Sequence, residues 1–314
     1  MKRIADGTES PFSPRVSQGN DLDGPAPAAA AARAWPRRSG RILRLLPAIA
    51  LLVAGPCLAG AWVQDEGAAL VILKASHSDS PRAFDDGHHR RSFPNGGSSR
   101  QDQLNLYVEY GLSPDLSFIG NFYANEMRYG DDGSYGKHTT RGLGDQEIGL
   151  RYRLGPGEGP WTGAAQFLVS IPAYDRDDEP ALGLGDYGAE LRYSVGRGYR
   201  LGTRSGYVDM GMAVRLRGAD AADEVRVDIA SGVALAPSWM AIAELNVIQG
   251  LGNGSGANPT NFIASNNYDL TKLQLSTLYT LPGGSQLQAG YQRPVAGRNT
   301  GAGGAVFVAA WWRF

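Results

Sequence analysis

The sequence predicts an all-β fold, a closed antiparallel β-barrel of about twelve strands. Three observations predict it. Apolar residues recur at every second position along most of the chain, the connections alternate between short and long, and the chain ends on an aromatic residue. The composition agrees, because 43 Gly, 14 Tyr and 6 Trp in 314 residues suit many strands and turns with aromatic girdles. It suits a helical enzyme poorly, since glycine weakens helix interiors.

Charge and cysteine content exclude several classes of protein. A mean hydropathy of −0.27 excludes a bundle of many membrane-spanning helices. A formal net charge of −1 offers no electrostatic footprint for nucleic acid. One cysteine excludes a disulfide framework and a cysteine-rich metal site. We therefore expect no nucleic-acid partner and no cofactor.

The N-terminal part is typical of a processed segment. Residues 1–36 are rich in Pro, Ala and Ser, and they predict a disordered extension or a start codon assigned too far upstream. Residues 37–61 combine two arginines, the apolar run 45–55 and a small-residue stretch, which together predict a helical signal peptide. A transmembrane helix is less consistent, because a span needs ~20 apolar residues. We expect cleavage after Ala61, which leaves Trp62 as the mature N-terminus.

The remaining residues, 62–314, alternate with a period of two rather than 3.6. Leu104, Leu106 and Val108, for example, alternate with polar neighbours. The segments run to ~10 residues, the length that a tilted strand needs to cross a membrane. The expected strands lie around 67–77, 104–110, 116–123, 147–154, 161–171, 188–195, 208–217, 225–229, 239–249, 272–279, 286–293 and 306–314.

The connections favour a membrane barrel over a soluble sandwich, which would also alternate. Short turns are expected at 113–115, 155–160, 236–238 and 282–284, and long polar loops at 78–101, 129–143, 173–186 and 250–268. Short periplasmic turns and long outer loops are the rule in outer-membrane barrels. Only the segment 218–224 is short where an outer loop is expected.

The C-terminus resembles the signal that directs bacterial outer-membrane proteins into the membrane. Trp312 and Phe314 lie on the apolar face of the last expected strand. The expected partners are therefore outer-membrane lipid and the barrel-insertion machinery. A closed barrel also leaves no unpaired strand edge in lipid. We expect a monomeric barrel in the outer membrane of a Gram-negative envelope.

One internal repeat carries a family resemblance. Gly-Leu-Gly-Asp at 142–145 leads into Leu-Arg-Tyr at 150–152, and a second copy at 183–186 leads into 191–193. We expect each copy to begin a strand that runs from the outer side to the periplasm. With the signal and the terminal aromatic, the repeat resembles the transporter-like outer-membrane barrels named after the meta-pathway of phenol degradation. The start Gly-Ala-Trp at 60–62 is more particularly similar to XagA-type proteins of exopolysaccharide and biofilm loci. The resemblance implies about twelve strands and passage of small solutes.

Charged residues on the polar strand faces are the candidate functional residues. Acids and bases alternate there, and a narrow lumen requires such charges to be paired. They form either a network that braces the wall or a pore that guides a small polar, anionic or saccharide solute. The expected lumen residues are Glu109, Asp145, Glu147, Arg151, Arg153, Glu190, Arg192, Asp209, Arg215, Arg217, Arg226, Asp228, Glu244 and Lys272.

Catalytic and metal sites are poorly represented. His88 and His89 lie in a charged loop, where paired histidines are usually solvated, so no metal is expected. Asp131, Asp132 and His138 have the residue types of a barrel protease, but a glycine-rich loop uses the same types for solubility. The sequence therefore predicts a channel or export pore and not an enzyme. The alternatives are a non-transporting structural or surface-interaction barrel, then a carrier of hydrophobic or aromatic compounds, and then a barrel hydrolase.

Overall fold

The computed structural model describes residues 60–314 except 157–159, 176 and 256–262. The expected extension 1–36 and the expected signal peptide up to residue 59 lie outside the described residues. Within the described part, no helix is long and apolar enough to cross a membrane.

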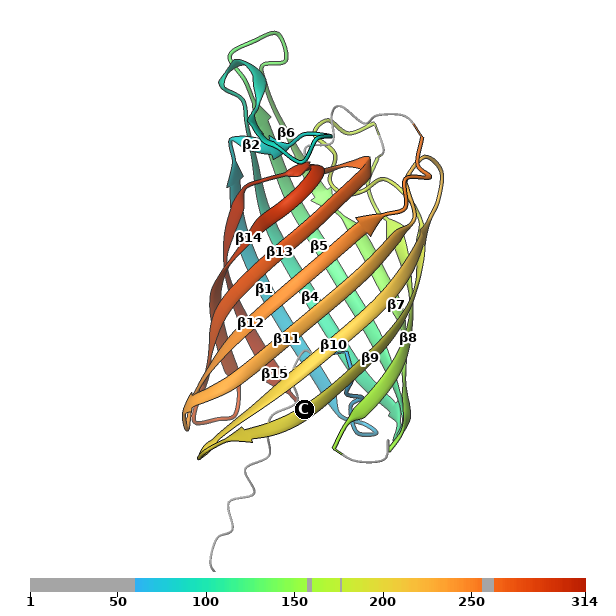
Figure 1. Cartoon of the computed structure of the whole chain (residues 1–314), viewed down its shortest axis with the longest axis vertical. Coiled ribbons are helices and arrows are strands. Elements are labelled where there is room, and N and C mark those ends of the chain that lie inside the picture. Colours follow the sequence, from blue (N-terminus) through green and yellow to red (C-terminus); the bar gives the residue numbers. More distant parts are fainter. Residues whose placement is uncertain (1–59, 157–159, 176, 256–262) are drawn as a thin grey trace, which may run out of the picture. The chain divides into compact units, whose positions relative to one another are not determined.

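The described residues form a closed antiparallel barrel of twelve strands, which confirms the predicted fold class. Each strand pairs with its neighbours along the chain, and β1 closes the ring by pairing with β15 (Figure 1). The strands of the ring are β1 (Ala69–Ser80), β4 (Ser98–Ser113), β5 (Leu116–Gly130), β7 (Asp145–Pro156), β8 (Thr162–Pro172), β9 (Gly188–Leu201), β10 (Arg204–Arg217), β11 (Glu224–Ala236), β12 (Trp239–Gly250), β13 (Ala264–Thr280), β14 (Gln286–Gly301) and β15 (Gly304–Arg313).

Three shorter strands extend the wall at the end away from the termini. β6 (Lys137–Leu143) continues the line of β7 across Gly144 and pairs with the upper part of β5. β2 (Arg82–Phe84) and β3 (Arg90–Ser92) form a hairpin that pairs with the end of β14. In Figure 1 the β5–β6 hairpin projects above the rest of the wall.

The alternation in the sequence sorts side chains between the two faces of the wall. On β10, Met212 and Leu216 are exposed by 57% and 58%, whereas Asp209, Ala213 and Arg215 are buried. Successive side chains of a strand point to opposite faces, so in a closed barrel one parity faces the interior and the other faces out. Here the apolar parity faces out. A water-soluble protein would not expose so much apolar surface.

Aromatic residues surround the exterior at the barrel end where the described termini, Gly60 and Phe314, are found. They come from strand ends next to the short turns, as in the girdles that flank the apolar band of membrane barrels. Trp239 packs on Tyr279 there, with their ring centroids 4.7 Å apart. The exposed members of this girdle include Tyr110, Tyr152, Trp161, Trp239 and Phe314.

The loops agree with the expected alternation, with one correction. The end with the termini carries short turns, and the opposite end carries the longer connections at 81–97, 173–187 and 251–263. The segment 129–143 was expected to be a loop, but β5 continues to Gly130 and β6 begins at Lys137. The expectation was wrong because polar residues there pair as strands beyond the apolar band, where no hydrophobic alternation marks them.

The interior is partly closed by apolar side chains near the termini. Leu70, Ile72, Ile242, Leu278 and Trp311 pack together there on the inner faces of four strands, β1, β12, β13 and β15. Trp311 and Leu70 are each 1% exposed. This cluster occupies one side of the barrel and leaves the other side to charged residues.

Candidate functional site

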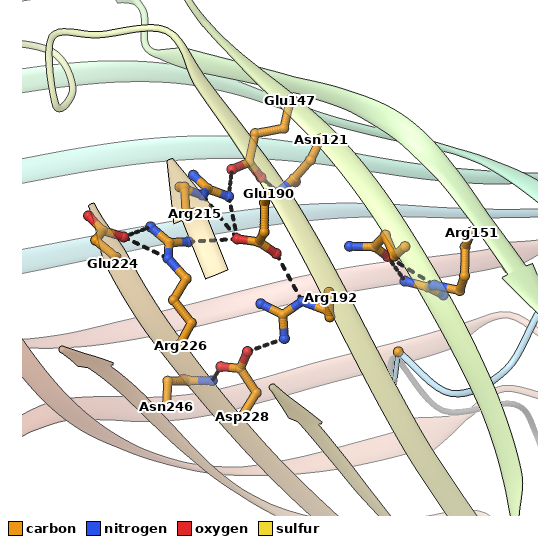
Figure 2. Close-up of polar contacts among 12 residues, drawn as sticks. Asn121, Glu147, Arg151, Glu190, Arg192, Arg215, Glu224, Arg226, Asp228 and Asn246 are labelled. Atoms are coloured by element: carbon orange, nitrogen blue, oxygen red, sulfur yellow. Dashed lines mark hydrogen bonds and ion pairs between the residues drawn. The ribbon is translucent and has the colours of Figure 1, made fainter. Parts of the chain in front are cut away.

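The candidate site is the barrel interior, where the structure places every residue of the expected lumen set. Half of them meet in one network of ion pairs, which spans four strands, β7, β9, β10 and β11 (Figure 2). Arg151 and Arg192 occupy matching levels, because both are Cα partners of Gln166 on the intervening strand β8. The register therefore agrees with their equivalent places in the sequence repeat.

Glu190 lies at the centre of this network. Its Oε1 accepts from Arg192 Nε at 2.9 Å, and its Oε2 accepts from Arg215 Nε at 2.9 Å. Arg226 Nη1 lies 3.6 Å from the same Oε2. Glu190 is 2% exposed, so three guanidinium groups surround a carboxylate that is removed from bulk water (Figure 2).

Two further carboxylates neutralise the guanidinium groups around Glu190. Arg215 Nη2 lies 2.6 Å from Glu147 Oε1. Arg192 donates to Asp228, which also accepts from Asn246 Nδ2 at 2.7 Å. Each guanidinium therefore contacts at least one carboxylate, which limits the cost of burying it.

Glu224 joins the network at the start of β11, at the barrel end with the longer connections. It was not predicted from the sequence. It is fully buried, and its two oxygens accept from Arg217 Nη1 at 3.0 Å and Arg226 Nε at 2.7 Å. Arg217 Nη2 also donates to the carbonyl of Leu184 in the loop 173–187. Sequence reasoning missed Glu224 because it assigned that position to a turn, although it shares parity with Arg226.

The network is balanced in charge. Its acids are Glu147, Glu190, Glu224 and Asp228, and its bases are Arg192, Arg215, Arg217 and Arg226. A separate pair joins Arg151 to Glu109 at 3.1 Å, with both side chains under 10% exposed. Arg153 lies closer to the termini and faces Asp115 at 3.3 Å. These contacts are compatible with a wall brace and with a lining for polar solutes.

The opposite side of the interior has an excess of positive charge. Lys74 on β1 reaches across to Gln274 Oε1 at 3.5 Å and lies 4.1 Å from the ring centroid of Phe307. Gln274 in turn donates to Glu244 Oε1 at 2.5 Å. Lys272 lies on the same side with no hydrogen bond or ion pair to another described residue. Two lysines thus share one carboxylate, and Lys74 was not among the predicted lumen residues.

A peptide at the start of the described chain occupies the interior from the end with the termini. Arg151 Nη1 donates to the carbonyl of Trp62 at 3.1 Å, and Gln64 N donates to Ser117 Oγ at 3.0 Å. Ala61 is fully buried, and the Trp62 ring meets Tyr207 edge to face at 6.4 Å. We call residues 60–66 the N-terminal peptide. No sequence pattern predicted the place of this peptide, because its residues do not alternate with the period of a strand.

The loop 173–187 covers the other end of the interior. Asp145 anchors it, accepting from Tyr174 Oη at 3.1 Å and from Leu184 N at 2.8 Å. Asn125 on β5 donates to the carbonyl of Leu182, whose side chain is 1% exposed. Burial raises the pKa of the Tyr174 phenol, and the adjacent Asp145 carboxylate raises it further.

The two copies of the Gly-Leu-Gly-Asp repeat therefore contact each other. Asp145 of the first copy starts β7, whereas the second copy, 183–186, lies in the loop before β9. The expectation that both copies begin a strand is wrong for the second. Leu184 N of the second copy donates to the carboxylate of the first. The repeat thus serves to hold the loop on the barrel mouth.

A cavity of about 230 Å³ lies between the loop and the lysine side. Its lining includes Ser78, Ser99, Gln101, Tyr268 and Lys272, together with Leu184 from the loop. Hydroxyl, amide and ammonium groups suit a small polar or anionic molecule better than a hydrocarbon. A larger hollow, about 790 Å³, lies on the outer surface over β1, β4, β5, β6 and β15 and is lined mainly by apolar side chains.

The histidines and the acidic loop residues have local partners. His88 Nδ1 contacts the carbonyl of Gly297 at 3.1 Å, and His138 Nε2 contacts the carbonyl of Tyr135 at 2.7 Å. Asp131 accepts from the backbone of two glycines in its own turn. In the described ranges no group of three or more metal-ligating side chains could hold a metal ion. A backbone N–H of His89 and the Arg91 guanidinium lower the pKa of Asp85 in the first long loop.

A scan against protein-family models finds no match, and a search of curated proteins finds none. Solved structures do match. The COG4313 outer membrane channel from Pseudomonas putida F1 is 19% identical with a TM-score of 0.60, over 81% of this chain and 98% of that one. The translocator domain of the autotransporter NalP from Neisseria meningitidis is 10% identical with a TM-score of 0.46, over 81% of this chain and 91% of that one. The similarity to the first structure shows that this chain has the fold of an outer-membrane β-barrel.

Proposed function

We propose that this chain is an outer-membrane channel of a Gram-negative envelope for small polar or anionic solutes, and that its interior is closed at rest. A saccharide of an exopolysaccharide or biofilm system is the candidate solute that the family resemblance adds. The observation that carries the proposal is the pairing of an apolar exterior with a charged interior. A barrel with apolar residues outside and polar residues inside is built for lipid around it and polar solutes within it.

Three features support a closed resting state. The N-terminal peptide and the apolar cluster around Trp311 fill the end with the termini. The ion-pair network around Glu190 occupies the middle of one side. The loop 173–187 covers the opposite end. Passage of a solute requires displacement of the peptide or the loop, and both are held by a few polar contacts rather than by a covalent link.

The lysine side supports the anionic class of solute. Lys74 and Lys272 face one carboxylate, Glu244, so this side has one more cation than anions. The cavity that Lys272 lines has a mixed lining, in which hydroxyl, amide and ammonium groups offer polar contacts that the hydrophobic or aromatic solutes of the phenol-pathway family name would leave unused. A solute carboxylate or phosphate would supply the missing negative charge.

A second candidate is a non-transporting structural or surface-interaction barrel. The specific observation in its favour is the balanced network, in which four carboxylates neutralise four guanidinium groups. A network of this kind braces a wall without any solute.

Conductance in planar bilayers distinguishes the two. The protein, purified from outer membranes, should give ion currents that an added acidic oligosaccharide reduces more than a neutral one of the same length. A variant without residues 60–66 should conduct more than the complete mature chain. If both proteins give no stable current, the structural barrel is the better description. Equal block by acidic and neutral sugars would contradict the anionic class.

Assembly through the C-terminal aromatic residues is part of the same proposal. Phe314 is 77% exposed, and its backbone pairs with Ala69 at the seam where the ring closes. Trp312 lies on the same outward parity, one step before Arg313. We expect deletion of Phe314 to lower the amount of heat-modifiable protein in the outer membrane. Replacement of Val306, which is exposed near the start of β15, by leucine is the control and should leave assembly unchanged.

A further inference from the structure

The carboxylate of Asp209 lacks an ion-pair partner, whereas the carboxylates of the network around Glu190 each contact a guanidinium group. Asp209 is 5% exposed and lies on the inner face of β10. It forms no ion pair with any other described residue. The nearest guanidinium groups, Arg151 and Arg192, are bonded to other carboxylates and act on Asp209 only at a distance. A buried carboxylate without a cation is costly.

The contacts of Asp209 come from the N-terminal peptide. Gly60 N donates to Oδ1 at 3.1 Å and Ala61 N donates to Oδ2 at 3.0 Å. Two successive backbone nitrogens thus face the two oxygens of one carboxylate. The site is tightly enclosed, since a Cβ on residue 60 would come within 2.6 Å of Ser194 Oγ. A larger residue at position 60 would require the Ser194 hydroxyl to move.

We propose that an envelope signal peptidase cleaves the chain between Ala59 and Gly60, and that the new α-ammonium group of Gly60 forms the ion pair with Asp209. Water adds across the peptide bond: its hydroxyl goes to the Ala59 carbonyl carbon, and the Gly60 nitrogen leaves as an amine that takes up protons. With an ordinary α-amino pKa of about 7.7–8.0, this group is mostly charged at neutral pH. The pair then anchors the N-terminal peptide inside the barrel.

The sequence around the bond is compatible with this cleavage. Cys57 and Ala59 are small residues at the third and first positions before it, as signal peptidases require. Cleavage after Ala61, which the sequence also allows, would remove both nitrogens that contact Asp209. An uncleaved chain would leave the carboxylate with neutral donors alone. The geometry therefore favours Gly60 over Trp62 as the first mature residue.

The first test is the intact mass of the protein expressed from the full-length gene and purified from the outer membrane. This inference rests on export to that membrane, which belongs to the proposed function. We expect a mature chain that begins at Gly60. A chain in the outer membrane that begins at Trp62, or at any other residue, would overturn the inference and leave the proposed channel standing. Full-length protein outside the membrane would overturn both.

The second test is acylation of the α-amino group in the folded barrel at neutral pH. An ammonium paired with Asp209 should react slowly, and Asp209→Asn should speed labelling by about tenfold, the ratio set by one pKa unit. Asp79→Asn is the matched control, because Asp79 pairs with Arg100 at the opposite end of the barrel, and it should leave the rate unchanged. Equal rates in the parent and in Asp209→Asn would overturn the ion pair.

An insertion keeps the test decisive if Asp209→Asn fails to assemble. One alanine placed between Ala59 and Gly60 moves the ammonium group one residue away while both N–H donors stay in the chain. We expect this variant to lose the protection from acylation and to unfold at a lower temperature than the parent. Protection from acylation and an unfolding temperature equal to those of the parent would overturn the ion pair.

Discussion

On the β7–β11 side of the interior, four carboxylates meet four guanidinium groups, whereas on the opposite side two lysines face a single carboxylate. The first side is balanced and its groups lie within direct contact distance. On the second side, the neutral Gln274 links Lys74 to Glu244, and Lys272 has no direct ion pair with a described residue. Both sides are parts of one wall with the same strand period.

This difference separates bracing from binding. Arginines with fixed, forked contacts hold four strands together, and each partner is already occupied. Lys272, on a flexible stem at the cavity, keeps its charge free for an incoming anion. We therefore assign stability to the arginine side and solute selection to the lysine side. The following variants test that assignment, from the largest effect on the free energy of unfolding to the smallest.

The largest effect is expected for Glu190→Gln, at the centre of the arginine side. It leaves three guanidinium groups around a neutral amide, and loss of one partner from a buried ion network costs about 3–5 kcal/mol. The free energy of unfolding in urea, measured on the refolded barrel, checks this. Asp79→Asn is the control, because its pair with Arg100 is about half exposed and is worth about 0–1 kcal/mol. Equal losses in the two variants would mean that the network does not brace the wall.

A smaller effect is expected for Tyr174→Phe, which acts on the loop 173–187 rather than on the wall. The phenol links Asp145 to the loop backbone at Gly185, and loss of such a hydrogen bond costs about 1 kcal/mol. The loop should then open more often, which limited proteolysis and the noise of single-channel currents would both report. Tyr187→Phe is the control, since Tyr187 is 59% exposed in the same loop. If proteolysis and current noise are unchanged in Tyr174→Phe, the backbone contacts of Leu184 are sufficient to keep the loop closed.

The smallest effect on stability is expected for Lys272→Met. Lys272 has no close polar partner, so its removal should change the free energy of unfolding by less than about 1 kcal/mol, within the range of an isolated charge change. The reversal potential should nevertheless shift toward cation selectivity, because the lysine side of the interior loses its excess positive charge. Lys137→Met on β6, which is exposed at the mouth, is the control. A large loss of stability in Lys272→Met without a shift in selectivity would contradict the assignment of solute selection to the lysine side.

The amino-acid sequence by itself determined the all-β barrel and most of its interior face. The period of two is a local property, so it assigns each side chain of a strand to one face before any partner is known. Closure into a ring then forces the charged face inward. For this reason Arg151 and Arg192, chosen from a repeat, lie at one level on either side of Gln166.

Only the tertiary structure decided which interior groups meet. Lys74 and Gln274 are 200 residues apart in the chain, and their contact depends on the curvature of the closed ring. The N-terminal peptide and the loop 173–187 have no strand period, so their place in the interior follows from hydrogen bonds to Asp209, Arg151 and Asp145. Local patterns determine the face of a strand, but contacts across a lumen depend on diameter and register, which arise only when all strands have paired.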